Sequence, residues 1–266
     1  MSRVTLSMVL LAVGLTVLAG PLSAQERRGR MRQPRAFSNE EPGELNTPYD
    51  GRFKFVRLRF TPIQGFGGGG GYFRGDLKWD HDYPRAELNF AKILDELTEI
   101  TPHMDGSNIL AVDDPELFKY PVAYMAEPGF WTLTPDEAES LRNYLLKGGF
   151  LIFDDFVGRH WYNFQDRIRD VLPDARLVEL DASHPIFNSF FEIEALNHYH
   201  PYYGVEAIFY GVFEDNDPDK RLLVIVNFNN DIGESWEWSD MGFIPIELTN
   251  EAYKLGVNYI VYAMTH

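Results

Sequence analysis

Cysteine is absent from this 266-residue chain. No disulfide can stabilise its fold, and mechanisms that need a thiolate nucleophile are excluded. The stability must come from a packed core, for which a chain of this length with 45% hydrophobic residues has enough material. The 20 Phe and 14 Tyr residues predict a core rich in aromatic rings.

Basic residues are scarce outside the first 35 residues. That segment holds six of the 24 Lys and Arg residues but one of the 40 acidic residues, which leaves a net charge of −21 on the rest of the chain. A strongly acidic body repels nucleic acids and anionic lipids, so neither is expected as its main partner. The basic tract at residues 27–32 could contact a membrane surface peripherally, but a solvated leader is the favoured interpretation.

Several nucleotide-binding and hydrolase motifs are also absent. The glycine-rich run at residues 64–73 follows the first expected strand and could hold an anion through its backbone N–H groups. It has neither the GxGxxG spacing nor the Lys-Ser/Thr ending of a phosphate-binding loop, so a mobile loop is favoured. No GxSxG nucleophile motif occurs.

The chain has one long apolar run, at its amino terminus. Arg3 precedes the run at residues 4–18, and residues 20–24 supply the helix break and small residues of a cleavage site. The run is shorter than the about 20 residues of a spanning helix. It predicts a signal peptide over residues 1–24, cleaved after Ala24, and an exported protein, periplasmic or extracellular. A retained anchor is the alternative; a lipoprotein is excluded because no Cys follows.

Residues 25–50 are polar and rich in Pro, Gly and Glu, which predicts a flexible linker. From residue 51 to 266 strand and helix patterns alternate. This pattern predicts a single α/β domain with a mostly parallel sheet and helices on both faces. The expected strands are residues 53–60, 109–112, 122–126, 150–153, 176–180, 205–213 and 222–228. The expected helices start near residue 85, at Thr134, near residue 161 and at Thr249, and residues 229–238 are expected to form a loop.

The domain is organised around the stretch at residues 147–156. Its apolar run is typical of a strand buried on both faces in the middle of a parallel sheet, and it stops at Asp154 and Asp155. Ligands of open α/β sheets bind at the carboxyl ends of the strands. The strands before it also run into acids: Asp113 and Asp114 follow one, and Glu127 follows the next.

Several separated motifs resemble the bacterial family called domain of unknown function 4159. They are DDPELF at residues 113–118, LRNYL at 141–145, GGFL at 148–151, DD at 154–155, HPIF at 184–187 and EAYKLGVN at 251–258. The resemblance covers about residues 53–266. It implies a flavodoxin-like fold related to class I glutamine amidotransferases, but no activity. Those enzymes carry a cysteine nucleophile after the central strand, where this chain has Asp154-Asp155, so glutamine hydrolysis through a thioester is excluded.

Two carboxylates side by side can act as a general acid/base pair or bind a cation. Asp154 and Asp155 are therefore catalytic candidates. In the equally weighted alternative, one caps the next segment and the other faces solvent. His184, before Pro185, is a weaker candidate and reads most simply as a turn residue.

Other histidines and rings give weaker signals. His198 and His200 have a spacing compatible with zinc, but an aromatic-rich surface is favoured. The His81-Asp82 pair could reach the same edge, although a hydrogen-bonded loop pair is favoured. Glu234 and Trp236 suggest a carbohydrate- or peptide-binding face, yet such rings more often cover a core.

Two functions follow. The first is a non-catalytic module that binds a small molecule or a protein partner through an acidic edge. Its expected residues are Asp113, Asp114, Asp154, Asp155, Glu234 and Trp236. The second is a hydrolase, with or without a metal ion, that uses Asp154 and Asp155 with His184 or with His198 and His200. Convergence of these acids and histidines in one place would favour the hydrolase. No cofactor is indicated.

Overall fold

The apolar run after Gly149 forms the middle strand of a seven-stranded sheet. In this computed structural model, which describes residues 46–63 and 76–266, β6 (Phe150–Phe156) is the fourth strand in the order β3-β1-β4-β6-β9-β8-β7. The other strands are β1 (Val56–Arg59), β3 (Asn108–Ala111), β4 (Val122–Ala126), β7 (Val178–Glu179), β8 (Ile208–Phe213) and β9 (Leu222–Phe228). The expected central position of this strand is confirmed.

Five of the seven strands run parallel. β3, β1, β4, β6 and β9 pair in parallel, with Val122 opposite Phe150 and Leu151 opposite Val224, whereas β8 and β7 join antiparallel. A separate antiparallel pair is formed by β2 (Thr61–Pro62) and β5 (Trp131–Thr132). The mixed α/β class with a mostly parallel sheet and a single domain is thus confirmed.

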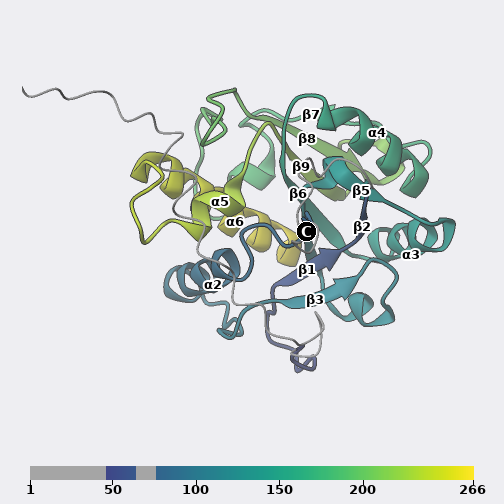
Figure 1. The fold of residues 1–266 in the computed structure, drawn as a ribbon, viewed down its shortest axis with the longest axis horizontal. Helices are drawn as coiled ribbons and strands as arrows, with labels where there is room; N and C mark the ends of the chain where they lie inside the picture. Colours follow the sequence, from purple (N-terminus) through teal and green to yellow (C-terminus); the bar gives the residue numbers. More distant parts are fainter. Residues whose placement is uncertain (1–45, 64–75) are drawn as a thin grey trace, which may run out of the picture. The chain divides into compact units, whose positions relative to one another are not determined.

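Helices cover both faces of the sheet (Figure 1). One face packs against α2 (Arg85–Leu97), α5 (Ile232–Glu237) and α6 (Ile246–Thr265); the other packs against α3 (Pro135–Leu146) and α4 (His160–Val171). Alternate strand residues divide between the faces: Tyr124 and Ile152 face the first set, and Met125 and Phe153 face the second. Four 3₁₀ turns complete this part of the chain: η1 (Pro115–Lys119), η2 (Pro128–Phe130), η3 (Pro185–Phe187) and η4 (Glu214–Asn216).

Helix α3 forms as its sequence predicts. Thr134 Oγ1 accepts a hydrogen bond from the Glu137 N–H at 3.2 Å, and Glu137 Oε2 accepts one from the Thr134 N–H at 2.7 Å. This capping box satisfies two backbone donors at the helix start. Gly148, with φ +118°, makes the turn into β6.

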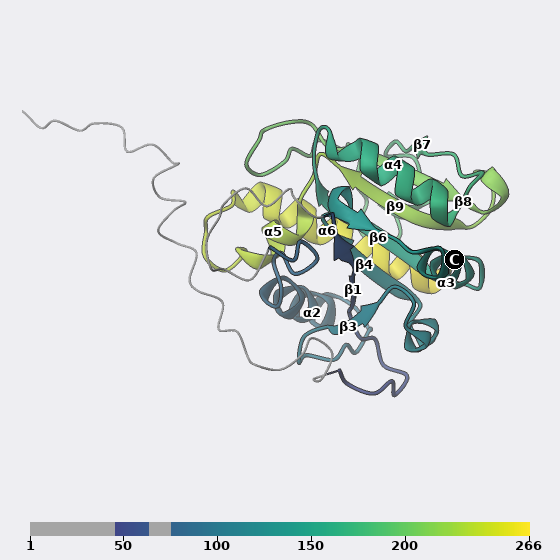
Figure 2. The same cartoon turned by 45° about the vertical axis from the view of Figure 1, so that its right-hand side comes forward.

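Two boundaries differ from expectation. Residues 232–237 form α5 rather than a loop, because Asp231 caps them by accepting a hydrogen bond from the Glu234 N–H at 2.8 Å. The closing helix starts at Ile246, not after a Thr249 cap; Thr249 lies in its first turn and is buried. Figure 2 shows α5 beside α2 at one end of the sheet.

The predicted signal peptide, most of the predicted linker and the glycine-rich run at residues 64–73 lie outside the described residues. Over the described ranges, none of the helices has the length and apolar character needed to cross a membrane.

Candidate functional site

Acidic side chains meet at the carboxyl ends of the three middle parallel strands. Glu127 follows β4, Asp155 lies near the end of β6, and Asp231 follows β9. The segment before α2 brings His81 and Asp82 to the same place, and α5 adds Glu234. We call this set the edge cluster: His81, Asp82, Glu127, Asp155, Asp231 and Glu234.

Members of the edge cluster, with the neighbouring Glu237, form three groups; within each group the ligand atoms lie within 4.8 Å of one another. The groups are His81 with Glu127 and Asp155; Asp82 with Asp155 and Asp231; and Asp82 with Glu234 and Glu237. Asp155 belongs to the first two groups and Asp82 to the last two. The four segments therefore assemble one continuous set of potential cation ligands.

Asp154 lies beneath the edge cluster as a structural anchor. Its Oδ2 accepts hydrogen bonds from the Tyr124 hydroxyl at 2.8 Å and from the N–H groups of Ile232 at 2.9 Å and Gly233 at 3.0 Å. Its Oδ1 accepts from Asn227 Nδ2 at 3.1 Å. Burial raises its pKa to about 6, while these hydrogen bonds favour the charged form. Asp154 thus ties the start of α5 to the central strand.

Asp155 has left-handed backbone, with φ +60°, where the register between β6 and β9 shifts. Its side chain is 13% exposed. Burial and the nearby Glu127 carboxylate raise its pKa well above the usual value, so loss of its proton is disfavoured unless a cation compensates. Lys78, Asp82 and Glu127 are also left-handed. Such strain in non-glycine residues costs about 1–3 kcal/mol each and concentrates at functional sites.

Asp82 is buried, with 4% of its surface exposed, and its Oδ2 atom has no hydrogen-bond partner. This oxygen packs against α5 at Gly233, where an added Cβ would lie 2.7 Å from Asp82 Oδ2 and 2.7 Å from the Tyr124 hydroxyl. Burial and Asp82 together raise the pKa of Glu234 to about 9. Ligand atoms of the buried Asp82 and the half-buried Glu234 lie within 4.8 Å of one another, which favours a shared proton or a cation between them.

His81 is held among three carboxylates. Its Nε2 lies 2.9 Å from Asp76 Oδ1, and its Nδ1 lies 3.1 Å from Glu127 Oε1 and 3.4 Å from Asp155 Oδ2. Burial alone would lower the pKa of His81, but the hydrogen bonds to Asp155, Asp76 and Glu127 raise it far above its usual value. Lys78 Nζ adds contacts of 2.8 Å to Asp76 and 3.4 Å to Glu127.

The other residues predicted to bind a ligand lie elsewhere. Asp113 is exposed, and Asp114 caps η1 by accepting a hydrogen bond from the Glu116 N–H at 2.9 Å. Trp236 is 1% exposed; its ring stacks on Phe90 at 4.4 Å and its Nε1 donates to the Ala252 carbonyl. Trp236 is thus a core residue, which supports the core-cover alternative over a ligand-binding face.

The three other candidate histidines do not join the edge cluster. His184 Nδ1 accepts a hydrogen bond from the Ile186 N–H, as a turn histidine would, and His200 Nδ1 accepts one from the Tyr202 N–H. His198 is buried, and burial lowers its pKa to about 4. Over residues 46–63 and 76–266, no group of three potential ligands includes any of them, so the structure gives the predicted zinc spacing no third ligand.

His81 is the histidine that reaches the edge, together with Asp82, although a hydrogen-bonded loop pair was the favoured interpretation from sequence. Glu127 and Asp231 carried a sequence signal, because each comes just after an expected strand. No pattern in the sequence indicated that the segment before α2 approaches this edge of the sheet.

A family model described as Domain of unknown function (DUF4159) matches residues 69–264. The match covers most of the chain, which therefore belongs to that family. No curated protein matches the sequence.

Proposed function

We propose that this member of the DUF4159 family is a ligand-binding module whose ligand is a divalent cation. The ion would be held at the carboxyl edge of the sheet by Asp82, Asp155 and Asp231. One observation carries the proposal: oxygens of these residues lie within 4.8 Å of one another, while Asp82 Oδ2 is buried without a hydrogen-bond partner.

Repulsion between the carboxylates supports this proposal. Carboxylates removed from water at such proximity repel one another, and each lost proton adds to the cost. A divalent cation removes this repulsion and occupies the open coordination of Asp82 Oδ2. Carboxylate oxygens are the ligands that Mg²⁺, Ca²⁺ and Mn²⁺ prefer.

A metal-assisted hydrolase is the second candidate, favoured by the position of Asp155. This residue has left-handed backbone near the end of the central strand, and its Oδ2 lies 3.4 Å from His81 Nδ1. A bound cation could polarise a substrate oxygen, and the imidazole could move a proton. His81 replaces the expected His184, His198 and His200 in this proposal, and no cysteine is required.

We further propose that the scaffold is flavodoxin-like and related to class I glutamine amidotransferases, with Asp155 where those enzymes carry their nucleophile. The residue order of the motifs and the turn at Asp155 support this. Export after cleavage near Ala24 is also proposed, supported by the pattern of residues 1–24. The basic tract at residues 27–32 would then be free to contact a membrane surface or a protein partner.

The test uses full-length protein freed of metal by a chelator. Calorimetry and thermal unfolding are followed while Mg²⁺, Ca²⁺, Mn²⁺ or Zn²⁺ is added. At a free concentration one hundred times Kd, a bound ion should stabilise the fold by about 2.7 kcal/mol. Asp82→Asn, which suits left-handed backbone, should weaken binding at least tenfold.

Asp113→Asn is the matched control, since Asp113 is an exposed acid outside the edge cluster, and it should bind as the wild type does. Binding that is absent for all four ions, or unchanged in Asp82→Asn, would contradict the proposal. Hydrolysis of chromogenic esters and phosphoesters with the best ion, lost in Asp155→Asn, would support the second candidate.

A further inference from the structure

Two of the ligand groups in the edge cluster share one carboxylate. The His81 group consists of His81, Glu127 and Asp155, and the Asp82 group consists of Asp82, Asp155 and Asp231. Their other members are the neighbours His81 and Asp82 from the segment before α2, together with Glu127 in the first group and Asp231 in the second. Asp155 is thus positioned between two sets of potential ligands, and a carboxylate has two oxygens with which to serve both.

The His81 group has the geometry of a coordination site. Two ligands that each lie about 2.1 Å from one ion are about 3.0 Å apart at a right angle and about 3.4 Å apart at a tetrahedral angle. His81 Nδ1 lies 3.1 Å from Glu127 Oε1 and 3.4 Å from Asp155 Oδ2. These separations match those of neighbouring ligands on one ion.

Asp76 orients the ring of His81. Its Oδ1 lies 2.9 Å from Nε2, the nitrogen that points away from the other carboxylates. Histidines that bind metals commonly donate their second ring N–H to a carboxylate, which fixes the tautomer and leaves the first nitrogen free to bind the ion. Lys78 Nζ, 2.8 Å from Asp76, holds this orienting carboxylate in turn.

The Asp82 group differs in chemistry, because all of its ligands are oxygens. Asp82 Oδ2 is buried and unpartnered, and Gly233 provides the space for it against α5. Asp231 is held by its cap to Glu234 and is itself buried. An all-oxygen set suits an ion such as Mg²⁺, Ca²⁺ or Mn²⁺, whereas imidazole with two carboxylates suits a transition metal.

Charge also favours more than one ion. Asp82, Glu127, Asp155, Asp231 and Glu234 are five carboxylates. Lys78 forms an ion pair with Glu127, and His81 forms ion pairs with Glu127 and Asp155. One divalent ion at the Asp82 group would leave Glu127 without an ion beside it. Two ions would have four of the five carboxylates as ligands: Asp82, Glu127, Asp155 and Asp231.

We propose that the edge cluster is a two-cation centre bridged by Asp155, an inference that rests on the proposed cation-binding function. A transition metal ion occupies the His81 group, and an oxygen-preferring ion occupies the Asp82 group. Mn²⁺ accepts both ligand sets and serves as the probe. Ions that share a bridge lie about 3.5–4 Å apart, close enough for two Mn²⁺ spins to couple.

The experiment titrates chelator-treated, full-length protein with Mn²⁺. Bound Mn²⁺ is counted by equilibrium dialysis with elemental analysis, and spin coupling is followed by electron paramagnetic resonance. The wild type and the control Asp113→Asn should bind two equivalents and show a coupled signal. Asp82→Asn should bind one equivalent, uncoupled, and Asp155→Asn should lose the coupling.

His81→Ala tests the first group and should bind one equivalent. Glu127→Gln is the second variant for the same group if His81→Ala fails to fold, as judged by circular dichroism. One equivalent in the wild type, two in both His81→Ala and Glu127→Gln, or coupling retained in Asp155→Asn would overturn the two-cation centre while cation binding stands. Zero equivalents in the folded wild type would overturn both.

Discussion

The carboxylates at the two ends of the parallel strands differ in their partners and in the direction of their pKa shifts. At the amino ends of β1 and β3, polar side chains form a closed network, which we call the amino-edge network: Asn46, Thr47, Asp50, Arg52, Lys54, His103, Asp105, Asn108 and Tyr120. At the carboxyl ends lies the edge cluster. The same sheet thus carries a paired surface and a surface with excess negative charge.

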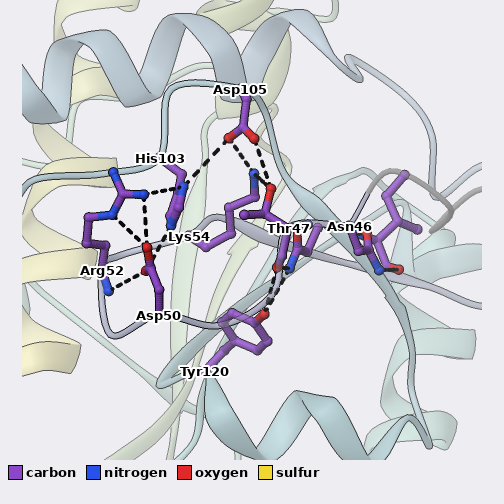
Figure 3. A network of polar contacts seen from close by, with 10 residues as sticks. Asn46, Thr47, Asp50, Arg52, Lys54, His103, Asp105 and Tyr120 are labelled. Carbon is purple, nitrogen blue, oxygen red and sulfur yellow. Dashed lines mark hydrogen bonds and ion pairs between the residues drawn. The ribbon is translucent and has the colours of Figure 1, made fainter.

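In the amino-edge network each carboxylate meets a cationic or polar donor. Figure 3 shows Asp50 beside Arg52 and His103, and Asp105 facing Lys54 and Thr47. Hydrogen bonds from His103 and Arg52 lower the pKa of Asp50, and the bond from Lys54 lowers the pKa of Asp105 to about 2. These contacts stabilise the charged forms of both carboxylates.

In the edge cluster burial raises the pKa of Asp155, Asp231 and Glu234 instead, and neighbouring carboxylates raise it further. The contrast separates carboxylates whose charged form is stabilised by donors from carboxylates whose neutral form is favoured by burial. A pKa shifted toward the neutral form marks a candidate functional site when the group lies at a buried position lined by several segments.

The largest expected effect concerns the anchor beneath the edge cluster. Asp154→Ala leaves the donors of Tyr124, Asn227 and the start of α5 unsatisfied inside the protein. We expect a loss of about 4 kcal/mol in the free energy of unfolding, measured by urea denaturation. Asp154→Asn should lose less, because its amide oxygen can still accept. If Asp154→Ala lost less free energy of unfolding than Asp105→Ala, the contrast between the two edges of the sheet would be contradicted.

The next effect is the pH dependence of the metal-free protein. Glu234 holds its proton up to a pKa of about 9 when folded but releases it near 4.5 when unfolded. The folded state therefore binds more protons between these values, and stability falls as pH rises, by up to about 1.4 kcal/mol per pH unit for one proton. Glu234→Gln should flatten this fall in urea denaturation at pH 5, 7 and 9.

The exposed Glu139→Gln in α3 is the control for that measurement and should keep the wild-type slope. If Glu234→Gln kept the wild-type slope of unfolding free energy against pH, Glu234 would not be the carboxyl that holds the proton. Addition of a bound cation should also flatten the slope, since it replaces the proton as the partner of the carboxylates.

The smallest effect belongs to the amino-edge network. The pKa of Asp105 is lowered, so its stabilising contribution is present above about pH 4 and is lost as pH falls through about 2. Because Asp105 is largely exposed, Asp105→Asn should cost about 1 kcal/mol or less at pH 7, and salt should reduce that cost. A cost that 0.5 M salt leaves unchanged would indicate that the network is not electrostatic.

The sequence predicted what depends on local pattern. The apolar run of β6, the capping box at Thr134 and the acids after the strands are short-range signals, and they located the sheet and its carboxyl edge. Helix α5 was missed although Asp231 and Glu234 have the spacing of a cap and its N3 acid, because Gly233 between them reads as a loop residue. A sequence cannot show that His81 and Asp82 approach this edge, since that depends on how the segment before α2 packs.

The same limit applies to the pair at the end of β6. Adjacent residues of a strand point to opposite faces, so Asp154 and Asp155 could not both face the ligand unless the strand was irregular. The register shift and the left-handed turn direct Asp155 to the edge while Asp154 stays in the interior. The sequence suggests that Asp154 and Asp155 act as a pair. The backbone instead makes Asp154 an internal hydrogen-bond acceptor and brings Asp155 to the edge of the sheet.

The edge cluster draws its members from four places along the chain, the first at His81 and the last at Glu234. Gly233 has no side chain, and even a methyl group there would meet Asp82 Oδ2 and the Tyr124 hydroxyl. No stretch shorter than residues 81–231 can contain both ligand groups, so a fragment that ends before Asp231 can carry at most the His81 group. The proposed two-ion centre would therefore form only after the segments from His81 to Asp231 have packed together, so binding of both ions would report that the domain has folded.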